Sequence, residues 1–154
     1  MIDSTKRVEK LPVEIFKIVD STDLEIAHRI RYEVFVLGQN VPAEDEIDQY
    51  ESQCHHFLAK VNEIPCGAAR WRITDKGVKL ERFAVLENYR SQGVGSALVQ
   101  AVLQDIGTYP ELSGRMHYLH AQLSAMPLYR KFGFRPVGEM FQECEIDHYK
   151  MVLS

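Results

Sequence analysis

The 154-residue sequence has no hydrophobic run near the length of about 18 apolar residues that a membrane-spanning helix needs. Its first ten residues, Met1 to Lys10, are polar and carry both signs of charge, so they do not resemble a secretory signal peptide. Cysteine is scarce. Cys54, Cys66 and Cys144 form an odd and widely spaced set, which is typical of small apolar side chains in a reducing compartment. We therefore expect a cytoplasmic protein without a disulfide framework or a membrane partner.

The sequence also lacks a strong excess of charge. Its 18 Lys and Arg residues stand against 22 Asp and Glu residues, for a formal net charge of -4. This balance argues against a general nucleic-acid-binding protein. The hydrophobic share of 45% and the charged share of 26% are ordinary for a globular domain. Because no internal repeat or low-complexity segment interrupts the chain, we expect a flexible segment over residues 1–12 and a single domain over residues 13–154.

The spacing of apolar residues predicts the secondary structure. Helical spacing follows a capping-box pattern at Thr22–Glu25 and ends at Gly38, with the apolar face formed by Ala27, Ile30, Val34 and Leu37. An acidic loop or short helix over Gln39–Glu51 comes next, and further helices are expected over Gln92–Ile106 and after Ser124. Alternating or β-rich segments predict strands at Val13–Val19, Cys54–Val61, Cys66–Thr74, Val78–Val85, Met116–Ala121, Phe134–Ile146 and His148–Leu153.

The order of these elements predicts an α/β fold with one mixed sheet. The sheet is mainly antiparallel at first, and the strand–helix–strand step from Val78 to Ala121 predicts a parallel pair with a right-handed crossover. Within the strand at residues 78–85, the apolar parity changes after Leu80, since Phe83 and Val85 follow the opposite alternation. A β-bulge produces such a change. A strand end that is buried on both faces explains it equally well.

The most informative segment begins a helix with Arg90-Ser91-Gln92-Gly93-Val94-Gly95-Ser96. Glycine lets a backbone approach a ligand closely, and the first amides of a helix have no partners within it and lie at the positive end of its dipole. This combination suits a phosphate or pyrophosphate. A P-loop is excluded because Gly-Lys-Ser/Thr is absent, and Leu98 weakens a dinucleotide fingerprint. A glycine-containing helix start without any ligand remains an equal alternative at this point.

This segment resembles the Arg/Gln-x-x-Gly-x-Gly/Ala loop of the GNAT superfamily of acyl-CoA-dependent N-acetyltransferases. A second stretch, Ala121–Phe134, resembles the other signature of that family, with Tyr129 and Gly133-Phe134 in the expected places. The similarity covers roughly residues 13–152 in the same element order. It implies the GNAT fold, with acetyl-CoA as co-substrate in an opening between the strands that end near Val85 and Ala121.

The resemblance also implies a set of site residues. Backbone amides around the glycine turn would hold the pyrophosphate of acetyl-CoA, and the strand end would pair its backbone with the pantetheine arm and polarise the thioester carbonyl. Tyr129 would protonate the departing thiolate, with a purely structural aromatic role as the alternative. The residues that the resemblance places at the cofactor are Phe83, Ala84, Val85, Arg90, Ser91, Gln92, Gly93, Val94, Gly95 and Ser96.

The acceptor side is less fully defined. Glu81 could take the proton of the attacking amine directly or through water, and His120 is the second candidate; ordered water alone is the third. Arg31 and Gln39 resemble positions near the acceptor pocket, while Gly38 departs from a glutamate of close relatives. The acidic residues of the loop Glu44–Asp48 would attract a cationic amine or simply face solvent. No metal spacing is present, because neighbouring residues of a strand, such as His55-His56, point to opposite faces.

We therefore expect a direct acetyl transfer from acetyl-CoA to a primary amine of an unidentified small-molecule or protein acceptor, by a monomer or a homodimer. The alternatives are a non-catalytic acyl-CoA-binding or sensing module and an N-acyltransferase that uses a longer acyl-CoA. Neither a metal nor a nucleic acid is expected to take part.

Overall fold

A computed structural model describes residues 12–154. Within these residues, seven strands form one sheet in the order β1-β2-β3-β4-β5-β7-β6, in which only β4 and β5 are parallel. This is the mixed α/β sheet that the sequence predicts. Most of the expected flexible segment lies outside the described residues. The strands are β1 (Val13–Lys17), β2 (His55–Val61), β3 (Ile64–Thr74), β4 (Gly77–Val85), β5 (His117–Gln122), β6 (Phe134–Glu143) and β7 (Ile146–Leu153).

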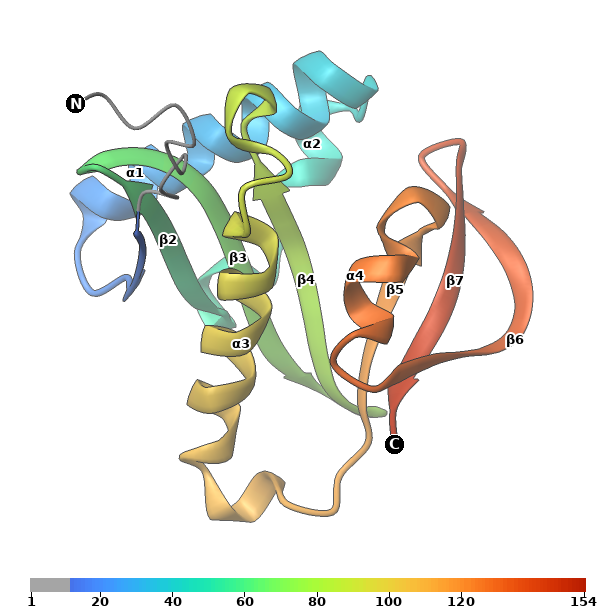
Figure 1. Ribbon diagram of the computed structural model, residues 1–154. Helices are drawn as coiled ribbons and strands as arrows, with labels where there is room; N and C mark the ends of the chain where they lie inside the picture. Colours follow the sequence, from blue (N-terminus) through green and yellow to red (C-terminus); the bar gives the residue numbers. More distant parts are fainter. Residues whose placement is uncertain (1–11) are drawn as a thin grey trace, which may run out of the picture.

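Helices cover both faces of the sheet (Figure 1). On one face lie α1 (Ser21–Arg31), a π-helical turn (Tyr32–Leu37) and α2 (Ala43–Glu46); on the other lie α3 (Val94–Gly107) and α4 (Met126–Arg130). The first face is closed by a small buried cluster, which consists of Ala27, Ile30, Val34, Leu58, Ala68 and Ala84. The second face holds the larger core around Trp71, Leu80, Leu98, Val102 and Leu119. The sheet therefore separates two hydrophobic clusters, a small one under α1 and a larger one under α3 and α4.

The start and end of the first helix differ from the prediction. The N-cap is Asp20 rather than Thr22, because the Asp20 carboxylate accepts a hydrogen bond from the Asp23 amide at 2.8 Å and also suits the positive end of the helix dipole. At the other end, Leu37 is 65% exposed instead of joining the apolar face. The intervening π-helical turn explains this, since its wider i→i+5 turn rotates every later side chain around the helix axis.

The hairpin of β6 and β7 also differs from the prediction. Its turn is Cys144-Glu145, with φ values of 49° and 64°, so Ile146 begins β7 instead of ending β6. Two consecutive residues with positive φ make the tight turn that matches the twist of a hairpin, and a Cys-Glu pair does not signal this turn in a sequence. As a consequence, Glu143 lies directly opposite Ile146, and Phe141 lies opposite His148.

Candidate active site

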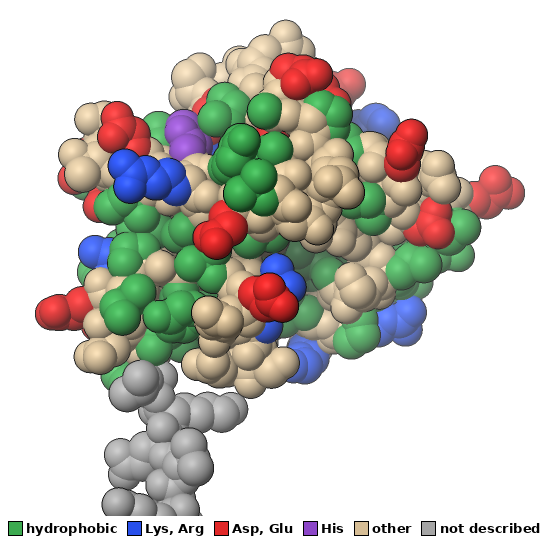
Figure 2. All heavy atoms as spheres, turned by 90° about the horizontal axis from the view of Figure 1, so that it is seen from above, with side chains coloured by type: hydrophobic (Ala, Val, Ile, Leu, Met, Phe, Trp, Pro, Cys, Tyr) green, Lys and Arg blue, Asp and Glu red, His purple; other side chains and the backbone are tan. Residues whose placement is uncertain are grey.

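A cavity opens where the sheet divides. The parallel strands β4 and β5 pair only at Val78–His117 and Lys79–Tyr118 and then diverge. The resulting cavity has a volume of about 760 Å³, and its wall includes residues of β4, β5, α4, the π-helical turn, α2 and the β6–β7 turn. Seen from above, charged side chains of both signs are scattered among apolar ones on this end of the described chain (Figure 2). The opening lies between the two strands for which the sequence predicts it.

Of the two explanations for the change of apolar parity, the β-bulge is the one found in β4. Ala68 pairs with Ala84 and Arg70 with Glu81, so Arg82 and Phe83 together face the single residue between them on β3. Arg82 has a φ of 60°, a left-handed conformation that is unusual outside glycine. Its guanidinium contacts the Glu46 carboxylate at 3.0 Å and Asp48 at 3.3 Å. These ion pairs tie the bulge to α2 and the loop that follows it.

Beyond the bulge, the residues predicted for the pantetheine arm divide between the two faces. Phe83 and Val85 line the cavity, whereas Ala84 is buried in the cluster under α1. Ala84 can therefore meet a ligand through its backbone only. Because β5 has moved away at this point, the edge of β4 is available for strand-like pairing.

The glycine turn at the start of α3 is shaped by two different requirements. Gly93 is the N-cap of α3 and has a φ of 87°, a conformation that favours glycine. A Cβ atom added to Gly93 would meet no atom within 4 Å, so the space outside the turn is open. Gly95 instead permits close packing, because its Cβ would lie 3.2 Å from the side chain of Leu128 in α4. Ser91 also has a positive φ, of 62°.

The side chains of the turn differ in whether they reach the cavity. Arg90 lines the cavity, and its Nε donates a hydrogen bond to the Val85 carbonyl at 3.1 Å, which joins the turn to the end of β4. Gln92 is exposed and donates to the Asn88 carbonyl at 3.0 Å. Val94 is buried in the core, and Ser96 is half-buried. The N–H groups of Val94, Gly95 and Ser96 have no partners within the helix, because the first helical hydrogen bond runs from Ala97 N–H to the Gly93 carbonyl at 3.0 Å. Of the predicted turn residues, Arg90 lines the cavity and Ser91 to Ser96 do not.

Tyr129 of α4 is buried, and its ring lines the cavity. It packs edge to face against Phe83 with ring centroids 5.7 Å apart, and against Phe134 at 6.2 Å. Burial raises the pKa of the Tyr129 phenol, so the hydroxyl is protonated at neutral pH. The structure thus places the ring of a protonated phenol against Phe83 of the β4 bulge.

Glu81 lines the cavity but is held by three cations. Its carboxylate contacts Arg70 Nε at 2.6 Å, Arg72 Nε at 3.1 Å and Lys79 Nζ at 3.5 Å. Burial acts to raise the pKa of Glu81, but the positive charges of Arg70, Lys79 and Arg72 outweigh it and lower this pKa. Glu81 is therefore ionised, as a base must be, but its neighbours make it a weaker proton acceptor.

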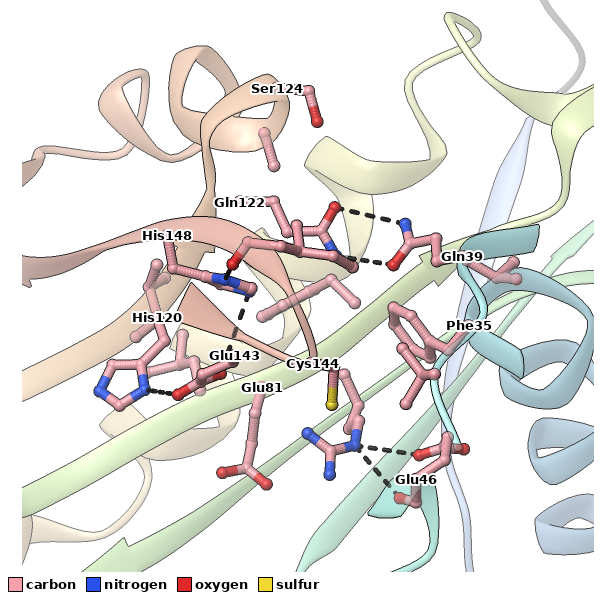
Figure 3. A pocket seen from close by; sticks show the side chains of 18 of the residues that line it. Phe35, Gln39, Glu46, Glu81, His120, Gln122, Ser124, Glu143, Cys144 and His148 are labelled. Atoms are coloured by element: carbon pink, nitrogen blue, oxygen red, sulfur yellow. Dashed lines mark hydrogen bonds and ion pairs between the residues drawn. The ribbon is translucent and has the colours of Figure 1, made fainter. Parts of the chain in front are cut away.

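The three residues predicted for the acceptor side separate. His120 and Gln39 line the cavity, whereas Arg31 is buried behind it, with hydrogen bonds to Glu46 and Glu51. Gln39 exchanges two side-chain hydrogen bonds with Gln122, at 2.7 and 3.3 Å, so these amides join the π-helical side of the cavity to the end of β5 (Figure 3). Of these three, only Arg31 lies away from the cavity.

The acidic loop has two kinds of carboxylate. Glu44 is exposed to solvent, whereas Asp45 lines the cavity, where its charge could attract an amine. Glu46 is buried between Arg31 and Arg82, and Asp48 contacts Arg70 and Arg82. These buried ion pairs fix the position of the wall that α2 contributes.

Sequence reasoning missed a cluster on the opposite wall. Glu143, Cys144 and His148 line the cavity from the β6–β7 hairpin, beside His120 of β5 (Figure 3). The Glu143 carboxylate accepts a hydrogen bond from His120 Nδ1 at 2.6 Å, which lowers the pKa of Glu143. Placing the hairpin turn at Cys144-Glu145 would have revealed this cluster, because that register sets His148 beside β6.

Residues 12–154 contain neither a cluster of metal-ligating side chains nor a membrane-spanning helix. No group of three or more His, Cys, Asp or Glu side chains in this range is arranged to hold a metal ion. No helix in this range is long and apolar enough to cross a membrane.

Comparisons with known proteins agree with this geometry. Residues 20–154 match the sequence family described as the acetyltransferase (GNAT) domain. YjcF of Bacillus subtilis (strain 168), named an uncharacterized N-acetyltransferase, is 42% identical over 130 residues, which cover 84% of this chain and 91% of that protein. The crystal structure of Escherichia coli ElaA is similar with a TM-score of 0.79 and 26% identity, over 94% of this chain and 100% of that chain.

Arabidopsis thaliana Naa50, solved in complex with the bisubstrate analogue CoA-Ac-MVNAL, is similar with a TM-score of 0.70 and 26% identity. The similarity covers 92% of this chain and 98% of that one. With the divided sheet, the β4 bulge and the glycine turn in place, these matches lead to one conclusion. The chain belongs to the GNAT family of acetyltransferases.

Proposed function

We propose that this enzyme transfers the acetyl group of acetyl-CoA directly to a primary amine while both substrates occupy the cavity between β4 and β5. The observation that carries the proposal is that one cavity is lined by Phe83 and Val85 at the end of β4, by Tyr129, and by Arg90, which directly precedes the glycine turn of α3. A bisubstrate analogue that joins CoA to an acetylated peptide is bound by the Arabidopsis relative, which fits a direct transfer.

The cofactor half of the cavity suits acetyl-CoA. The N–H groups from Gln92 to Ser96 would hold the pyrophosphate, with the guanidinium of Arg90 as an additional donor. The pantetheine arm would pair with the backbone of Phe83–Val85, and an amide of this segment would stabilise the oxyanion. Ser91 shapes the turn through its positive φ.

The chemistry also needs a proton acceptor and a proton donor. The amine must lose a proton before it attacks the thioester, and the departing thiolate must gain one. Tyr129 is the proposed donor, because burial keeps its phenol protonated. His120 is the proposed acceptor. Since an ionised carboxylate only accepts hydrogen bonds, the Nδ1 of His120 donates to Glu143, and the Nε2 of neutral His120 carries a free lone pair. Glu81 is the alternative acceptor.

A covalent acetyl-enzyme is not part of the proposal. Cys144 is the one cysteine that lines the cavity within the described residues. Burial, with the nearby carboxylates of Asp45 and Glu143, raises the pKa of the Cys144 thiol, so little thiolate is present at neutral pH. We expect Cys144→Ser to retain kcat within about twofold. A labelled acetyl group found on Cys144 after incubation with acetyl-CoA would contradict direct transfer.

The proposal is tested by titration calorimetry with acetyl-CoA and by an assay of thiol release. The assay uses a panel of acceptors: a small alkylamine, an amino acid, a polyamine, an aminoglycoside and a peptide with a free amine. We expect saturable acetyl-CoA binding and amine-dependent release of CoA. Binding of acetyl-CoA without acetyl transfer to any of these amines would contradict the proposed reaction. Repeating the assay with longer acyl-CoA donors determines the acyl chain that the cavity accepts.

A further inference from the structure

The acceptor half of the cavity contains two hydrogen-bond acceptors that face each other without a donor between them. His148 Nδ1 lies 2.6 Å from the Ile146 carbonyl oxygen. A carbonyl only accepts hydrogen bonds, so Nδ1 carries the proton of the neutral ring, and the lone pair lies on Nε2. This Nε2 is 3.9 Å from Glu143 Oε2. The Glu143 carboxylate and the Nε2 edge of the His148 ring thus lie side by side at the cavity wall (Figure 3).

This arrangement has the chemistry of a site for an ammonium group. A nitrogen placed at about 2.8 Å from each atom, the usual length of a charge-assisted hydrogen bond, would donate one N–H to Glu143 and one to His148. A primary ammonium has a third N–H, which is then free to face the proposed base. An alcohol has only one O–H and no charge, so it cannot satisfy both acceptors.

Contacts on each side hold the two acceptors, although Glu143 is itself exposed. His148 is buried and stacks on Phe141 with ring centroids 5.9 Å apart, while the second carboxylate oxygen of Glu143 is held by His120. The ionisable groups that face this pair are His120 of β5 and Lys79 of β4. Lys79 also contacts Glu81, which offsets part of its charge. The Glu143 carboxylate therefore lies next to the Nε2 atom of His148.

The rest of this half favours an apolar carbon skeleton without an acid group. Phe35, Val41, Leu119 and Ile146 line it. Its cations, Lys79 and Arg82, already contact carboxylates. An acceptor with a carboxylate beside its amine would therefore approach Glu143 without a ready cationic partner.

We infer that Glu143 and His148 form the subsite for the acceptor, which enters as a primary ammonium on an apolar carbon skeleton. This inference rests on the proposed function, since it names the class of amine that the same cavity takes. No bond is made or broken at the subsite. It positions the nitrogen, and the proton then passes to the base.

The test measures binding rather than turnover. The full chain is saturated with CoA, which cannot donate an acetyl group, and is titrated at pH 7 with isoamylamine, isoamyl alcohol or leucine while its NMR spectrum is followed. We expect isoamylamine to bind at least tenfold more tightly than isoamyl alcohol or leucine. The advantage over the alcohol should fall as the pH rises past about 10, where the amine loses its charge.

Two variants and two matched controls locate the effect. Glu143→Gln and His148→Phe should each reduce the advantage of the amine to less than threefold. Glu145→Gln changes a carboxylate of the same turn outside the cavity, and His117→Phe changes a ring whose Nδ1 has the same contact with a backbone carbonyl, 2.7 Å from Arg115 O, also outside the cavity. Both controls should keep the full advantage. CoA affinity should stay within twofold in all four variants, which reports that each one is folded.

The outcomes separate the two proposals. Equal binding of the amine and the alcohol to the wild-type chain, or an advantage that survives in both cavity variants, would overturn the ammonium subsite even if acetyl transfer occurs. Selective binding of isoamylamine that depends on Glu143 and His148 would support the subsite even if the preferred acceptor proves to be another amine. Failure of the acetyl-transfer assay would count against the proposed reaction, and the inference would fall with it.

Discussion

Glu51 provides the strongest test of how the acceptor wall is held, because its carboxylate joins two buried arginines. It contacts Arg31 Nη1 at 2.7 Å and Arg70 Nη1 at 2.6 Å, and it also contacts His28. Burial acts to raise the pKa of Glu51, but the hydrogen bond and charge of Arg31, with His28, outweigh it and bring the pKa to about 2, from an ordinary 4.5. At about 1.36 kcal/mol per pKa unit, this difference corresponds to about 3 kcal/mol of folding free energy.

The sign of the pH dependence follows from the lowered pKa. Protons bind more readily to Glu51 in the unfolded chain, so its contribution is fully present above about pH 5 and is lost as the pH falls toward 2. We predict that Glu51→Gln lowers the free energy of unfolding by about 3 kcal/mol at pH 7, because it removes one of the charged partners of each buried arginine; Arg31 then keeps Glu46, and Arg70 keeps Asp48 and Glu81. The difference from the wild type should shrink steadily below pH 5.

Urea unfolding followed by circular dichroism at several pH values measures this difference. Glu25→Gln on the exposed side of α1 is the matched control, and it should change stability by less than about 0.5 kcal/mol at every pH. A difference between Glu51→Gln and the wild type that stays constant from pH 7 to pH 3 would refute the reasoning, because it would mean that ionisation of Glu51 is not the source of the stability.

Three further predictions concern catalysis and folding. Tyr129→Phe should lower kcat by about tenfold to a thousandfold with little change in KM for acetyl-CoA, and an unchanged kcat would remove Tyr129 from the mechanism. In steady-state assays over pH 6 to 9.5, His120→Gln should lower kcat/KM most at low pH, where less of the amine is already deprotonated. If Glu81→Gln instead causes a larger loss of kcat/KM than His120→Gln, and that loss depends on pH, Glu81 is the base. Asp20→Ala should destabilise the protein by about 1 kcal/mol in urea unfolding, because α1 loses its N-cap; no change would mean that another group caps the helix.

The fold could be predicted because its signals are local. Alternating apolar residues mark the strands, and the parity change after Leu80 correctly indicates the bulge of β4. The errors arise where two local signals compete. Asp20 and Thr22 are both capable caps, and the carboxylate two residues earlier is the one used. Leu37 is exposed because of the π-helical turn, and the spacing of apolar residues in the sequence does not predict such a turn.

The two halves of the site differ in how far a sequence can define them. The proposed cofactor half lies in two short segments around Phe83 and Gly93, so one motif and one strand are enough to predict it. The proposed acceptor half is assembled from distant segments. Gln122 meets Gln39, and His148 lies opposite Gln122 because of the register between β5 and β7. The position of Arg31 likewise depends on which carboxylates fold over it, and this pairing is a property of the three-dimensional structure alone.

The proposed reaction depends first on the main-chain N–H groups at the start of α3, which would hold the pyrophosphate of acetyl-CoA. An amide NMR titration of the full chain with CoA tests this, compared with a titration with pantetheine, which lacks the pyrophosphate. We predict that CoA moves the amide signals of Gly93, Val94, Gly95 and Ser96 more than any others, and that pantetheine leaves them in place. Saturable CoA binding that leaves these four signals unmoved would contradict it.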